Sequence, residues 1–162
     1  MKRFNLIASI FAASLIFNTA SAEGYWGAKV ATVDVDANGY SSALNLGLFV
    51  GAEFAQAGSN VVSLEGELTK SLIEGDTSSS STDYSVQTLA LYAAMRTGSD
   101  KYIKVKAGIL DREIALSPGG TGSDSGLSWG IGFGFNKYEI EYTFFDGDGN
   151  ADISMISVGY MF

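Results

Sequence analysis

The chain has 162 residues, with 18 acidic and 10 basic side chains, 20 glycines, one proline, and neither cysteine nor histidine. The formal charge of −8 argues against a nucleic acid as partner, because phosphate binding requires a basic surface. The lack of cysteine excludes disulfides, and the lack of histidine excludes Ser-His-Asp and Cys-His catalysis and histidine-ligated metal sites.

The first 22 residues have the composition of an export signal. Lys2 and Arg3 precede an apolar stretch, and Ala20-Ser21-Ala22 is a small-residue cleavage site. We expect residues 1–22 to be a signal peptide cleaved after Ala22, and residues 23–162 to form a single domain. An uncleaved membrane anchor is the alternative. Removing Lys2 and Arg3 leaves 8 basic residues against 18 acidic ones, a formal charge of −10.

Apolar and polar residues alternate with a period of two throughout the remaining chain, which is typical of β-strands. In YEIEYTFF, for example, Tyr138, Ile140 and Tyr142 share one face and Glu139 and Glu141 the other. We expect eight strands of roughly 9–11 residues, a length that crosses a bilayer when tilted. They lie around residues 26–30, 43–54, 62–68, 89–96, 102–112, 127–135, 138–145 and 156–162.

The predicted connections alternate in length. Those at 55–60, 97–101 and 136–137 are short, whereas those at 34–41, 73–83, 113–125 and 146–152 are longer and rich in Ser, Gly and Asp. Short turns at one end and longer loops at the other are typical of an outer-membrane barrel.

The polar face of the strands is predicted to point inward. It carries many glycines, which make room for long side chains in a narrow eight-stranded interior. It also carries five basic and five acidic residues, and a buried face needs such a balance because unpaired buried charge is costly. We predict a lumenal ion-pair network of Lys29, Glu53, Glu65, Glu67, Arg96, Lys104, Lys106, Arg112, Glu139 and Glu141.

Three segments resemble the OmpA/OmpX-like family of small outer-membrane β-barrels. They are the aromatic C-terminal strand ISVGYMF, the LSWGIGFGF strand that leads into YEIEYTFF, and LYAAMRTGSDKYIKVKAGIL. The resemblance implies an all-β, eight-stranded antiparallel up-and-down transmembrane barrel in the outer membrane of a Gram-negative bacterium. It further implies that Tyr160 and Phe162 are recognised by the outer-membrane assembly machinery.

For the function, we expect a structural or surface-interaction role without enzymatic activity or cofactor. The expected partners are outer-membrane lipid, lipopolysaccharide, the assembly machinery and an unidentified surface partner, and the barrel is expected to be a monomer. A narrow pore for ions or water, formed by rearrangement of the lumenal charges, is an alternative. A soluble periplasmic up-and-down barrel that binds a lipophilic ligand is a further one.

The longer loops carry many carboxylates and no Lys or Arg. The stretch DGDGNADI, residues 146–153, has the acidic spacing that begins a calcium loop, but it lacks that loop's glycine at the sixth position and glutamate at the twelfth. A hairpin turn is the simpler interpretation. A weak cation site shared with the first loop is the alternative, and its candidate ligands are Asp34, Asp36, Asp146, Asp148 and Asp152.

Overall fold

A computed structural model describes residues 23–37, 39–77, 82–147 and 151–162. The predicted signal peptide lies outside these residues, as do Asp148 and the serines at 78–81. Within the described part of the chain, no helix is long and apolar enough to cross a membrane.

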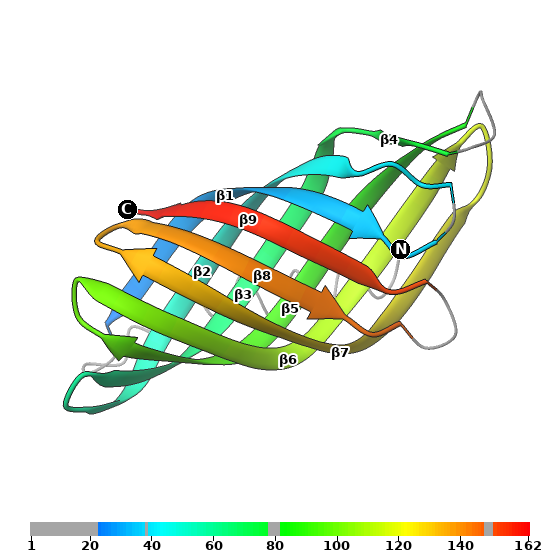
Figure 1. The fold of residues 1–162 in the computed structure, drawn as a ribbon. Helices are drawn as coiled ribbons and strands as arrows, with labels where there is room; N and C mark the ends of the chain where they lie inside the picture. Colours follow the sequence, from blue (N-terminus) through cyan, green and yellow to red (C-terminus); the bar gives the residue numbers. More distant parts are fainter. Residues whose placement is uncertain (1–22, 38, 78–81, 148–150) are drawn as a thin grey trace.

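The described residues form one antiparallel sheet that closes on itself (Figure 1). The strands are β1 (Gly24–Val35), β2 (Ala43–Ala57), β3 (Asn60–Ile73), β4 (Gly75–Asp76), β5 (Asp83–Gly98), β6 (Lys101–Ser117), β7 (Thr121–Phe135), β8 (Tyr138–Phe145) and β9 (Ile153–Met161). Apart from β3 and β4, each strand pairs with its neighbour in sequence, and the wall closes because β1 also pairs with β9 and β3 pairs with β5. The two-residue β4 pairs only with the start of β5, so eight strands make the barrel. The predicted all-β, eight-stranded up-and-down barrel is confirmed.

The short turns lie where the alternation ends. β7 and β8 are joined by Asn136 and Lys137 alone, and Asn136 has a φ of 53°. Asparagine tolerates this left-handed conformation better than most residues, so the two-residue hairpin forms without large strain. The last long loop, residues 146–152, also has the predicted bounds.

The prediction of a third long loop is wrong. Residues 113–125 are mostly strand, because β6 continues to Ser117 and β7 begins at Thr121, with pairing as far as Ala115 and Thr121. The Ser- and Gly-rich composition suggested a loop, yet Ile114 and Leu116 continue the inward phase of β6. The eight strands of the barrel therefore range in length from 8 to 17 residues, a wider range than expected. Figure 1 shows the β6–β7 hairpin and the start of β5 extending beyond the ends of β1 and β8.

The wall presents opposite chemistries on its two faces. Large apolar side chains point outward and are exposed, for example Leu127, Ile109 and Phe133. Buried residues of the inward face include Lys29, Glu65, Glu67, Lys104, Lys106 and Glu141. The polar face is thus the inner one, as predicted from its glycines.

Candidate functional site in the barrel lumen

The strand period places the lumenal charges in pairs. Glu65 and Glu67 of β3, Lys104 and Lys106 of β6, and Glu139 and Glu141 of β8 are each two residues apart, so both members of a pair point inward. Lys29 joins them from β1. Acidic and basic strands therefore face one another across the barrel.

These seven side chains form one connected cluster. The ammonium nitrogen of Lys104 lies 3.1 Å from Glu65, 2.6 Å from Glu139 and 2.7 Å from Glu141. Lys106 lies 2.6 Å from both Glu67 and Glu141. The nitrogen of Lys29 lies 2.5 Å from Glu67 and 3.5 Å from Glu141. The Lys104–Glu141 contact is close in distance but lacks hydrogen-bond geometry.

A second charged group lies nearer the short turns. The guanidinium of Arg96 lies 2.6 Å from Glu53 and 4.2 Å from the ring centroid of Tyr25. The Tyr25 hydroxyl donates to Glu65 at 2.5 Å, and the Tyr102 hydroxyl donates to Glu139 at 3.0 Å. The two tyrosines therefore connect this group to the lysine–glutamate cluster. Sequence reasoning missed both, although Tyr102 shares the phase of the lysines on β6.

Glycines opposite these side chains provide the space that they occupy. A Cβ added at Gly134 would lie 1.9 Å from a ring carbon of Tyr102, and one at Gly51 would lie 2.1 Å from Tyr25. One added at Gly130 would lie 2.8 Å from the Lys106 side chain. The prediction that small residues make room for long ones on neighbouring strands is confirmed.

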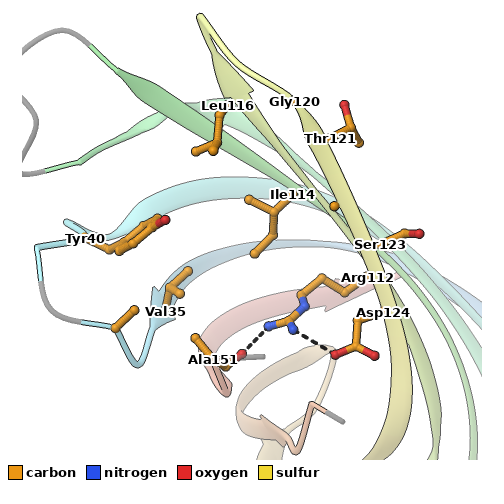
Figure 2. Close-up of a pocket in the computed structure, with 12 residues that line it drawn as sticks. Val35, Tyr40, Arg112, Ile114, Leu116, Gly120, Thr121, Ser123, Asp124 and Ala151 are labelled. Carbon is orange, nitrogen blue, oxygen red and sulfur yellow. Dashed lines mark hydrogen bonds and ion pairs between the residues drawn. The ribbon is translucent and has the colours of Figure 1, made fainter. Parts of the chain in front are cut away.

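Arg112 does not join the glutamates. Its side chain lies near the long loops, where Nη2 lies 3.1 Å from Asp124 and Nη1 donates to the Ala151 carbonyl (Figure 2). The guanidinium also lies 4.9 Å from the ring centroid of Phe145. The ten predicted charges are therefore divided, with Lys29, Arg96, Lys104 and Lys106 facing five glutamates within the lumen. These nine groups carry one net negative formal charge.

An apolar cluster separates the lumenal charges from the long loops. It contains Val33, Val35, Ala43, Tyr84, Val86, Leu110, Phe145, Ile153 and Met155, and most of them are at the loop ends of their strands. Between it and the charges lies a layer of neutral hydrogen bonds, in which Asn45 donates to Thr69 at 2.9 Å and Thr69 bonds Thr88 at 2.8 Å. We refer to the nine apolar residues as the outer plug. This plug was not predicted from the sequence.

The first and last long loops meet at the rim. The backbone N–H of Asp36 donates to the carbonyl of Asp152 at 2.8 Å. Asp34 accepts a hydrogen bond from Ser42, and the Asp152 carboxylate accepts one from the Gly147 N–H at 3.3 Å. Asp146 is exposed, and Asp148 lies outside the described residues. Within the described ranges, no group of three or more His, Cys, Asp or Glu side chains is placed to hold a metal ion.

The C-terminus packs beside the N-terminal strand. Phe162 stacks on Trp26 with ring centroids 4.2 Å apart, and Tyr160 meets both Tyr138 and Phe162 edge-on. The Phe162 N–H donates to the Trp26 carbonyl at 2.9 Å. Tyr160 and Phe162 thus complete an outward aromatic group at the short-turn end.

Solved barrels of small outer-membrane proteins have this architecture. Ail, the attachment invasion locus protein of Yersinia pestis, matches with a TM-score of 0.54 and 17% identity over 87% of this chain and 97% of its own. Neisserial surface protein A matches with a TM-score of 0.54 and 15% identity over the same shares. The N-terminal barrel domain of OprF from Pseudomonas aeruginosa gives 0.52 and 11% over 88% and 100%.

At these identities the likeness shows the fold. The resemblance predicted from the sequence is confirmed at that level. A further structure of Ail, with a TM-score of 0.52, is a complex with the heparin analogue sucrose octasulfate. No family model and no curated protein sequence matches this chain.

Proposed function

We propose that the chain is an integral outer-membrane protein with a closed lumen and a structural or surface-interaction role. The observation that carries this proposal is the inversion of polarity across the wall. Leu127 is 74% exposed on the outer face, whereas Lys106 is 3% exposed in the lumen. A bilayer solvates an apolar exterior, and water does not. A soluble barrel would have the opposite arrangement.

The lumen is proposed to be filled and not conducting. The seven-residue cluster occupies its middle, and the outer plug covers the cluster on the side of the long loops. An ion that entered would have to displace buried ion pairs and then pass an apolar layer, and both steps are unfavourable. This argues against the narrow-pore alternative. An eight-stranded barrel has an interior just wide enough for side chains.

The proposed route to the membrane uses both ends of the chain. Residues 1–22 direct export and are removed after Ala22, and the assembly machinery then recognises the terminal strand through Tyr160 and Phe162. The exposed ring of Phe162 beside Trp26 supports this proposal, because an aromatic pair at the end of the wall suits the membrane interface. The partners there are lipid and lipopolysaccharide, and the protein functions as a monomer.

The proposed surface role rests on the long loops, which carry carboxylates without Lys or Arg. Such loops favour cationic partners and repel anionic ones. We propose no enzymatic activity, because the buried carboxylates Glu139 and Glu141 are engaged with Lys104 and Lys106.

Three measurements test the proposal. Membrane fractionation should place the protein in the outer membrane, and its mobility on a gel should differ between boiled and unboiled samples. Recovery in the soluble periplasm, without a heat-dependent shift, would show that the membrane assignment is wrong. Recordings across a planar bilayer should show no discrete conductance. Discrete current steps whose size changes on substitution of Glu139 would instead establish the pore.

A further inference from the structure

A cavity opens at the outer mouth of the barrel, above the outer plug (Figure 2). Its volume of about 490 Å³ lies within the range of roughly 300–1,000 Å³ that small-molecule sites occupy. Its main lining side chains are Val35, Tyr40, Arg112, Ile114, Leu116 and Asp124. Residues from the β6–β7 extension thus face residues from the first loop across an open space.

Two glycines keep this space open. Gly122 pairs with Ile114, and Gly120 lies across the turn from Leu116. Gly122 is two residues from Asp124 on the same strand and therefore points to the same inner face. A Cβ added at Gly120 or Gly122 would meet no atom within 4 Å. The cavity therefore arises because Gly120 and Gly122 have no side chains, whereas β6 carries the large apolar Ile114 and Leu116 beside them.

The cavity has an apolar wall and a polar floor. Ile114 and Leu116 form part of the wall, together with the ring of Tyr40. The floor is the Arg112–Asp124 ion pair, in which Arg112 is only 2% exposed. A guanidinium has five N–H donors and a carboxylate accepts several hydrogen bonds, so the floor presents both donors and acceptors.

The charges of the mouth select against ionic ligands. An anion would pass the exposed carboxylates of Asp34, near the end of β1, and Asp36, in the loop that follows. A cation at the floor would lie against Arg112. Because Arg112 and Asp124 already neutralise each other, an added ionic group would be a buried, uncompensated charge.

We propose that this cavity binds an uncharged amphipathic small molecule. Its apolar body packs against Ile114 and Leu116, and an amide- or hydroxyl-type head group exchanges hydrogen bonds with Arg112 and Asp124. The inference goes beyond the proposed membrane role and requires only the folded barrel.

A chain-matched series of ligands tests the head-group chemistry. The full mature protein, refolded in lipid nanodiscs with isotope-labelled isoleucine and leucine methyl groups, is titrated with octanamide, octanoate and octylamine. Octanamide should shift the Ile114 and Leu116 resonances saturably, with a Kd at least about tenfold lower than either charged analogue, because each analogue buries an unpaired charge. Equal or tighter binding of octanoate or octylamine would overturn the assignment, as would the absence of saturation with all three.

A matched pair of substitutions tests the location. Gly122→Trp fills the cavity and should abolish the saturable octanamide shifts. Ser125→Trp places the same side chain three residues away on the outward face of β7 and should leave the Kd unchanged. Unaltered binding to G122W would show that the ligand lies elsewhere. If G122W does not give the heat-dependent gel shift of the folded barrel, Gly122→Leu serves for the same comparison, with weakened binding expected and unaltered binding overturning the proposal.

Discussion

At the scale of single residues, Lys104 forms more ion pairs than any other cation of the lumenal group. Its ammonium group is within 3.1 Å of three different glutamates, and all four side chains are buried. The lumen contains four cationic groups and five carboxylates, so losing a cation and losing a carboxylate have different consequences. The first raises the net negative charge to two, and the second removes it.

Lys104→Met is therefore expected to be more destabilising than Glu141→Gln. Leaving buried charges without their partner typically costs about 3–5 kcal/mol, and we expect K104M to reach this range. Lys70→Met, at an exposed outward position, makes the same substitution and should stay within about 0.5 kcal/mol of the parent. Urea unfolding in lipid vesicles measures all three. A cost for E141Q as large as that for K104M would contradict the charge count.

Gly134 illustrates a residue whose role is to have no side chain. A Cβ there would lie within 2.4 Å of three ring atoms of Tyr102, whose hydroxyl bonds Glu139. Gly134→Ala should therefore destabilise the barrel by about 1–3 kcal/mol in the same unfolding assay, as overpacking does elsewhere. Gly122→Ala, where an added Cβ meets nothing, is the control and should be nearly neutral. Adding Tyr102→Ser should reduce the penalty of G134A, and an undiminished penalty would point to another cause.

At the scale of strands, the sequence predicted the elements better than their ends. The alternation in YEIEYTFF identifies β8 and its inward glutamates, because only one face is apolar. The outer plug was missed for the complementary reason. Near the long loops, the inward Val33 stands between the polar, outward Thr32 and Asp34, whereas the inward Phe145 follows the apolar Phe144. The apolar residues therefore do not keep one phase along the strand, and a period of two does not say which face is inward where that phase changes.

The residues of the candidate site could be predicted from the sequence, but which of them contact one another could not. The glutamates and lysines share one phase, which placed them in the lumen. The height of each residue along the barrel depends on the stagger between strands, and this is why Arg112 was grouped with charges that it does not contact. The cavity at the mouth depends on the extension of β6 and β7, which the Gly- and Ser-rich sequence concealed.

The terminal strand provides a test of assembly that is separate from stability. Phe162 and Phe135 are both exposed aromatic residues near the short turns, at 57% and 47% exposure. Phe162→Ala should lower the amount of protein in the outer membrane severalfold, because the proposed assembly signal is lost, whereas Phe135→Ala should not. Refolded in vitro, each should lose only about 1 kcal/mol, the size of the Phe162–Trp26 ring contact or of the contact between Lys101 and the Phe135 ring. Equal outer-membrane levels of the two variants would argue against a signal at Phe162.

At the scale of the whole molecule, this chain combines the barrel fold of its structural neighbours with an acidic charge. Residues 23–162 are strongly acidic, and the long loops carry no basic residue. Arg112, which lines the cavity at the mouth, is buried and paired with Asp124. The fold that this chain shares with Ail therefore does not by itself imply that it binds the sulfated ligand of the Ail complex.

We expect that the protein does not bind sucrose octasulfate, the ligand in the Ail complex. Like charges repel at the loops, and no exposed guanidinium is available at the described rim to pair with a sulfate. Calorimetric titration at low salt, where electrostatic binding is strongest, should give no heat of binding with this protein and measurable heat with Ail as the positive control. Replacing Asp34, Asp36 and Asp152 by lysine should introduce binding that weakens as salt is added. Salt-sensitive binding by the unsubstituted protein would mean that the acidic loops do not determine which partners approach the barrel.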